Sequence, residues 1–133
     1  MSGSEGPDVA GAVRRGVRLF NRGRYVSAHQ AWESAWHGVG AEDRGFLEGL
    51  VQIAASLHLR TRRGGTRGAA HLLSQALVIL EDYRPRAHGI DVDALVEDFG
   101  GFLEWMRRVD RPHRLLDRFR IPRLRCDSRR VAE

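Results

Sequence analysis

The sequence predicts an all-α protein, a compact antiparallel helical bundle of about five helices with a basic C-terminal arm. Apolar residues recur three and four positions apart in five segments, and the connections between these segments are mostly short and contain glycine or proline. No segment reads as a strand. Because 133 residues with 42% hydrophobic content supply one core, we expect residues 1–7 to be a disordered leader, 8–124 a single helical domain and 125–133 a basic tail.

The first two helices are expected to form a hairpin. Asp8 belongs to the residue types that cap helix N-termini, and the first helix should run from there to about residues 21–23. The second should run from about residue 24 to 37, where Gly38 and Gly40 end it. Its apolar face consists of Tyr25, Ala28, Trp32, Ala35 and Trp36.

The third helix, from about residue 41 to 62, is the most apolar segment. Its apolar residues cover more than half of the circumference, so we expect it to be the central helix of the bundle. Gly64 or Gly65 should end it, and Thr66 should cap a fourth helix that extends to about Tyr83.

The fifth helix is expected from about residue 92 to 109, after a loop bracketed by Pro85 and Gly89. Trp105 falls at the edge of its apolar stripe, beside charged residues, so we expect a partly exposed ring that marks a partner surface. A short last segment should return to the bundle, with its helicity limited by Pro122.

All 22 basic residues are arginine, and the net charge is +5. An arginine-only composition points to a GC-rich genome as much as to a function. The charge is nevertheless uneven, because residues 107–130 hold ten arginines against three aspartates. We interpret this arm as a solvated tail or a dimer contact, and contact with nucleic acid is the alternative. Its arginines between apolar residues are Arg118, Arg120, Arg123, Arg125, Arg129 and Arg130.

Several classes of protein are not expected. The chain has no run of 18 apolar residues and no basic-then-apolar start, so we expect a cytoplasmic protein outside the membrane. Cys126 is the single cysteine, which leaves no pair for a disulfide or a zinc site. We also find no His-Glu-x-x-His helix and no glycine-rich nucleotide loop, and we therefore predict no metal and no cofactor.

Four polar residues form a candidate pocket. His29 and Glu33 are four positions apart on the second helix, as are Glu48 and Gln52 on the third. If the second and third helices pack as a hairpin, these four side chains would converge beside the Tyr25, Trp32 and Trp36 face. Three interpretations stay open: a hydrogen-bonded structural network, which we favour, a site for a small molecule or divalent cation, and a general base for catalysis.

A second candidate is an anion site at the turn before the fourth helix. Arg60, Arg63, Thr66 and Arg67 surround a helix N-terminus, where guanidinium and free N–H groups suit a phosphate. A solvated turn is the alternative that we favour.

Two motifs resemble a known family. They are Phe20-Asn21-x-Gly23-x-Tyr25-x-x-Ala28-His29-x-x-Trp32-Glu33-x-x-Trp36 and Phe46-Leu47-x-Gly49-Leu50-Val51-Gln52-x-Ala54-Ala55, followed by Gly68-Ala69 before a leucine-rich helix. Together they are similar to the prokaryotic domain-of-unknown-function family 309 over about residues 10–83. The resemblance implies a compact all-α fold and no established function. Gln30 stands where that family usually has Glu, and Glu48 where it often has Gln, so an activity that needs the first carboxylate is in doubt.

Our leading hypothesis is a non-catalytic helical binding domain that uses the pocket of His29, Glu33, Glu48 and Gln52. The partner would be a small ligand or a protein, and a second copy of the chain is a further candidate. The alternatives are a metal-assisted hydrolase at the same cluster and nucleic-acid contact through the arm.

Overall fold

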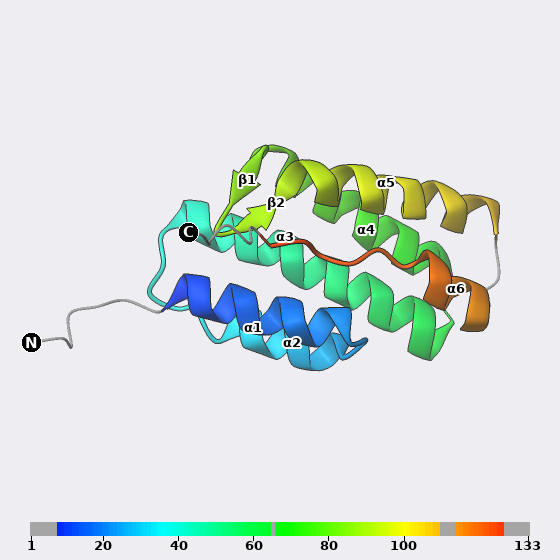
Figure 1. Cartoon of the computed structure of the whole chain (residues 1–133), viewed down its shortest axis with the longest axis horizontal. Coiled ribbons are helices and arrows are strands. Elements are labelled where there is room, and N and C mark those ends of the chain that lie inside the picture. The colour runs from blue at the N-terminus through cyan, green and yellow to red at the C-terminus, as the bar shows by residue number, and fades with distance from the viewer. Residues whose placement is uncertain (1–7, 65, 110–113, 127–133) are drawn as a thin grey trace, which may run out of the picture.

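The predicted all-α fold is confirmed by a computed structural model, which describes residues 8–64, 66–109 and 114–126. The helices in these ranges form an antiparallel bundle around one hydrophobic core (Figure 1). The predicted leader, residues 1–7, lies outside the described residues. The elements are α1 Val9–Asn21, α2 Tyr25–Glu33, α3 Ala41–His58, the π-helical turn η2 Leu59–Arg63, α4 Thr66–Glu81, β1 Arg86–Ala87, β2 Ile90–Asp91, α5 Val92–Arg108 and α6 Arg114–Arg120.

Helices α1 and α2 form the predicted hairpin. The Asp8 carboxylate accepts a hydrogen bond from the Gly11 N–H at 2.9 Å, which confirms this residue as the N-cap of α1. Gly16 lets the two helices approach closely, because a Cβ there would overlap the Trp32 indole. The fully buried indole in turn donates to the Val13 carbonyl at 3.3 Å.

Helix α2 ends at Glu33, before the predicted end at residue 37. The Ser34 hydroxyl donates to the Ala31 carbonyl at 2.6 Å, and the Ala35 and Trp36 N–H groups donate to carbonyls three residues back. These contacts satisfy the last carbonyls of the helix locally and tighten its final turn.

Helix α3 is the central helix, as predicted. It lies between α2 on one side and α4 on the other (Figure 1), and Phe46, Leu47, Leu50, Ile53 and Leu57 are fully buried. At its C-terminal end the chain continues as the wider π-helical turn η2. Gly64 then adopts φ 74°, which is the left-handed conformation expected of the residue that ends the helix.

The loop before α5 contains a small hairpin, so the prediction of no strand is wrong here. Strands β1 and β2 pair in antiparallel fashion, with Ala87 opposite Ile90. Two-residue strands are too short to show alternation in a sequence. His88 and Gly89 have φ 49° and 81°, and positive φ at both central residues is typical of tight hairpin turns.

Trp105 is buried, contrary to the expectation of a partly exposed ring. It is only 7% exposed and lies in α5 close to two guanidinium groups. The Cζ atoms of Arg60 and Arg120 lie 5.3 and 5.4 Å from the centroid of its ring. Sequence periodicity placed the ring at the edge of the stripe because the covering residues come from other segments.

The chain after α6 is extended and returns along the bundle, where it crosses in front of α3 between α1 and α5 (Figure 1). The Asn21 amide donates to the Leu124 carbonyl at 3.0 Å and accepts from the Leu124 N–H at 2.9 Å. The Asp91 N–H donates to the Arg125 carbonyl at 2.9 Å, and Cys126 forms a β-bridge with Ile90. Arg125 and Cys126 are therefore attached to the bundle, although the sequence places them in the tail; residues 127–133 lie outside the described residues.

Among the described helices, none combines the length and the apolar character that crossing a membrane requires.

Candidate functional site

The first predicted pair, His29 and Glu33, forms on the surface of α2. The Nε2 atom of His29 lies 3.0 Å from the Oε2 atom of Glu33, and the two side chains are 35% and 55% exposed. Solvent screens a pair with this exposure, so it contributes little to stability.

The second predicted pair forms on α3. The Gln52 amide donates to the Glu48 carboxylate at 3.3 Å, and Glu48 is exposed. The Gln52 Oε1 atom is buried and has no hydrogen-bond partner in the described part of the chain. No hydrogen bond or ion pair of the described residues joins this pair to His29 or Glu33.

The described ranges also contain no group of three His, Cys, Asp or Glu residues placed to hold a metal ion. The four predicted residues thus stand as two separate pairs, and a ligand for either pair stays a prediction.

The predicted anion site needs a correction at Arg60. This side chain is fully buried, and its Nε and Nη2 atoms donate to the two carboxylate oxygens of Asp117 at 2.9 and 3.0 Å. Its Nη1 atom donates to the Thr66 hydroxyl at 3.2 Å and the Val109 carbonyl at 3.4 Å. The anion that Arg60 binds is therefore a carboxylate of this chain, and Thr66 serves the same buried network. Of the predicted set, only Arg63 and Arg67 are exposed.

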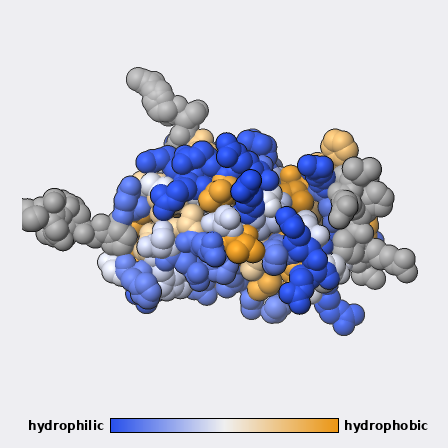
Figure 2. All heavy atoms as spheres, turned by 90° about the horizontal axis from the view of Figure 1, so that it is seen from below, coloured by the Kyte–Doolittle hydropathy of each residue, from blue (hydrophilic) through white to orange (hydrophobic). Residues whose placement is uncertain are grey.

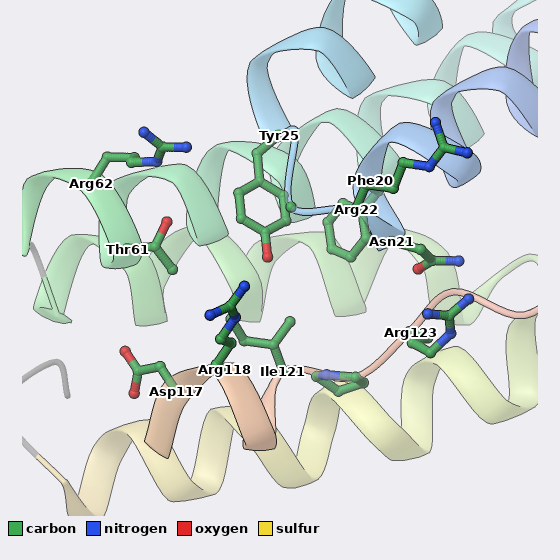
Figure 3. Close-up of a pocket in the computed structure, with 12 residues that line it drawn as sticks. Phe20, Asn21, Arg22, Tyr25, Thr61, Arg62, Asp117, Arg118, Ile121 and Arg123 are labelled. Carbon is green, nitrogen blue, oxygen red and sulfur yellow. The ribbon is translucent and has the colours of Figure 1, made fainter. Parts of the chain in front are cut away.

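The Arg60–Asp117 ion pair fixes α6 on the bundle and so builds one wall of a cleft. The cleft has a volume of about 1150 Å³ and lies between the turn that joins α1 and α2, the π-helical turn η2, and the arm (Figure 3). We call it the arginine cleft, and its described lining residues are Phe20, Asn21, Arg22, Gly23, Tyr25, Thr61, Arg62, Asp117, Arg118, Ile121, Pro122 and Arg123.

The lining of the arginine cleft carries an uncompensated positive charge. Arg22, Arg62, Arg118 and Arg123 are all exposed, and none of their side chains forms a hydrogen bond or an ion pair with another described residue. Asp117 is the one acidic residue of the described lining, and Arg60 already holds its carboxylate. Four guanidinium groups are thus available to an anion from solvent.

Tyr25 places a neutral hydroxyl in the same cleft. Its ring packs edge-on against Phe20 with 5.0 Å between the centroids, and its hydroxyl points toward the space beside Arg118 (Figure 3). Burial raises the pKa of Tyr25 to about 12, although the positive charge of Arg62 opposes the shift. The hydroxyl has no hydrogen-bond partner among the described residues, so it is available to a ligand as a donor.

Sequence reasoning missed this cleft because its arginines come from three segments: the turn between α1 and α2, the turn η2, and the arm. These segments meet only when the arm packs on the bundle. One signal was present. Arg60 follows Ile53 and Leu57 on the apolar stripe of the third helix at spacings of seven and three. An arginine on a buried stripe requires an acidic partner, and Asp117 is one of three acidic residues in an arginine-rich segment.

Residues 13–72 match the family model described as a domain of unknown function, DUF309, which confirms the resemblance over that segment. The match includes α2, α3 and η2 with Arg60 and Arg62, whereas α6 and the extended arm lie outside it. A comparison with proteins of curated function finds no match.

Proposed function

We propose that this protein is a non-catalytic binding domain that holds a phosphate-bearing ligand in the arginine cleft. The observation that carries the proposal is the set of four exposed guanidinium groups, without partners in the described residues, around one cleft. Guanidinium groups form charge-assisted and often bidentate hydrogen bonds to phosphate. The neutral Tyr25 hydroxyl adds a donor that suits the same oxygens.

The lining residues support binding rather than catalysis. A general base needs a titratable group that is available near neutral pH. In the described lining, the Asp117 carboxylate is held by Arg60, the pKa of Tyr25 is raised to about 12, and the Thr61 hydroxyl donates to the Leu57 carbonyl at 2.7 Å. The cleft therefore offers hydrogen-bond donors and positive charge, and this combination suits recognition of an anion.

The test is calorimetric titration of the full chain with inorganic pyrophosphate at low salt. We expect saturable binding that weakens as salt is added, because exposed charges are screened. The variant Arg118→Gln should weaken this binding about tenfold, since each hydrogen bond to a charged group contributes about 1.5 to 3 kcal/mol.

The matched control is Arg67→Gln, which removes one exposed arginine outside the cleft. It should leave pyrophosphate binding unchanged. Equal losses in Arg118→Gln and Arg67→Gln would mean that binding follows net charge alone, and a loss confined to Arg67→Gln would place the anion at the turn before α4. Either result overturns the proposal.

A further inference from the structure

We propose that the phosphate-bearing ligand is a single strand of nucleic acid, whose backbone follows the arginine cleft and one of whose bases stacks on Phe119. This inference rests on the proposed function and names its ligand class. Three features of the described residues carry it: the elongated distribution of the arginines, the exposed ring of Phe119 on the helix that carries Arg118, and the concave shape of the site.

The arginines are spread along the cleft instead of meeting at one point. In Figure 3 Arg62 lies at one end of the view, Arg22 and Arg123 lie at the other, and Arg118 lies between them. A second hollow of about 240 Å³ shares Tyr25 and Arg62 with the arginine cleft. A single phosphate uses donors that converge, whereas a row of separate cations suits a chain of phosphates.

The second hollow extends the positive surface past Tyr25. Arg24 and His58 line it together with Arg62, and no acidic residue is among its described lining residues. Val26, which is 47% exposed, adds an apolar contact there. The two hollows share lining residues, and their cationic side chains extend from the arm to the start of α2, a longer row than one phosphate group requires.

Phe119 supplies an uncovered aromatic face on α6, the helix that carries Arg118. Its side chain is 86% exposed, the highest value among the large hydrophobic residues of the described chain. It directly follows Arg118 in α6, and it is not among the described lining residues of either hollow. In the proposed complex the strand leaves the cleft over α6 after its contact with Arg118 and places a base on the exposed ring; bases of any sequence stack on such rings.

Other occupants fit these features less well. A duplex keeps its bases stacked inside, where Phe119 cannot reach them. A flat membrane surface does not enter a hollow, and stable membrane attachment needs more apolar contact than one phenylalanine provides. The face over α1 and α2 is mainly hydrophilic and carries separate apolar spots rather than one continuous patch (Figure 2), which does not suit an apolar protein partner.

The test measures fluorescence anisotropy of a labelled single-stranded oligonucleotide of about eight nucleotides, in ribose and deoxyribose forms, with the full-length protein. We expect at least one form to bind more tightly than pyrophosphate. With four phosphates contacted, the logarithm of the affinity should fall with the logarithm of salt concentration with a slope of about −3, and Arg118→Gln should reduce the slope by about 0.7.

Phe119→Ala distinguishes this inference from general anion binding. It should weaken oligonucleotide binding about tenfold, leave pyrophosphate binding unchanged, and be rescued by Phe119→Tyr. The matched control is Val78→Ala on α4, which removes another exposed apolar side chain, 72% exposed and outside both hollows, and should change neither affinity. Urea unfolding should show that Phe119→Ala leaves stability unchanged, because the ring is not packed in the core.

The outcomes separate the two proposals. Pyrophosphate binding that depends on Arg118, with no tighter oligonucleotide binding or no effect of Phe119→Ala, overturns the single-strand inference and leaves the proposed function standing. Absence of binding by both probes overturns both proposals. Tighter binding of a duplex than of the single strand, or binding only to phosphatidylserine vesicles, assigns the surface to another partner and also overturns the inference.

Discussion

The guanidinium of Arg60 holds both carboxylate oxygens of Asp117, which follows it by 57 residues, at 2.9 and 3.0 Å. The two side chains are 0% and 4% exposed, so this is a buried ion pair with two hydrogen bonds. It joins the end of the central helix to the basic arm. The pair thereby holds α6, which forms one wall of the arginine cleft, on the bundle.

Removing the acidic partner of this pair should destabilise the protein. We expect Asp117→Ala to lower the free energy of unfolding by about 3 to 5 kcal/mol, because it leaves a buried charge without a counterion. Urea denaturation followed by circular dichroism measures the loss. The double variant Arg60→Met with Asp117→Leu should regain most of it, since apolar residues of similar volume need no counterion.

The control for that experiment is Arg125→Ala. The pair of Arg125 with Asp98 at 3.0 Å also fixes the arm, but its side chains are 64% and 32% exposed. Its loss should cost no more than about 1 kcal/mol. Equal losses for Asp117→Ala and Arg125→Ala would contradict the special role of the buried pair.

Two glycine substitutions should act in opposite directions. Gly16→Ala should destabilise by about 1 to 3 kcal/mol, because the new methyl group overlaps the buried Trp32 indole. Gly101→Ala should stabilise by up to about 1 kcal/mol, because no atom lies within 4 Å of the new Cβ and alanine favours the helix. Thermal unfolding of both variants shows whether each substitution raises or lowers the stability. A destabilised Gly101→Ala would show that α5 needs this glycine for another reason.

Alkaline pH should destabilise the protein through Tyr25. Its pKa is raised from 10.0 to about 12 in the folded state, so the stabilisation is complete below pH 10 and is lost as the pH rises toward 12. Two pKa units correspond to about 2.7 kcal/mol at full loss. The measurement is urea unfolding between pH 9 and about pH 12, with Tyr25→Phe as the control.

The control should show a smaller fall in stability over the same range. Tyr83, whose pKa is also raised by burial, still titrates in that variant, so part of the pH dependence will remain. An identical pH dependence in the two proteins would remove Tyr25 as the cause.

The pair of His29 and Glu33 offers a test of the leading sequence hypothesis. Glu33→Ala should change the free energy of unfolding by less than about 1 kcal/mol, because both side chains are partly exposed. It should also leave pyrophosphate binding unchanged. Loss of pyrophosphate binding in Glu33→Ala would show that the ligand binds at the pocket predicted from the sequence and not in the arginine cleft.

Most features that depend on residues close together in the sequence were predicted correctly, whereas most features that depend on distant residues were not. The Asp8 cap, the central position of α3 and the end of its last turn at one of two glycines, Gly64 or Gly65, depend on neighbours within a few residues, and each was predicted. The early end of α2 depends on the Ser34 hydroxyl, which competes with the backbone in a way that periodicity does not reveal.

The candidate site was predicted less well because it depends on docking of the arm. The reciprocal hydrogen bonds between Asn21 and Leu124 connect residues 103 positions apart, and the buried Trp105 contacts arginines of two other segments. The pairs on single helices, His29 with Glu33 and Glu48 with Gln52, were accessible from their spacing of four. Their convergence into one pocket required tertiary information that spacing does not contain.

Because Asp117 lies late in the chain, Arg60 is synthesised well before its partner. Ribosomes add about 5 to 20 residues per second, so Arg60 precedes its partner by about 3 to 11 seconds. During that interval the guanidinium must stay hydrated, because burial without a counterion is strongly unfavourable. On the nascent chain, α1 and α2 have their packing partners early, whereas the surroundings of Trp105 cannot close until the arm has been translated.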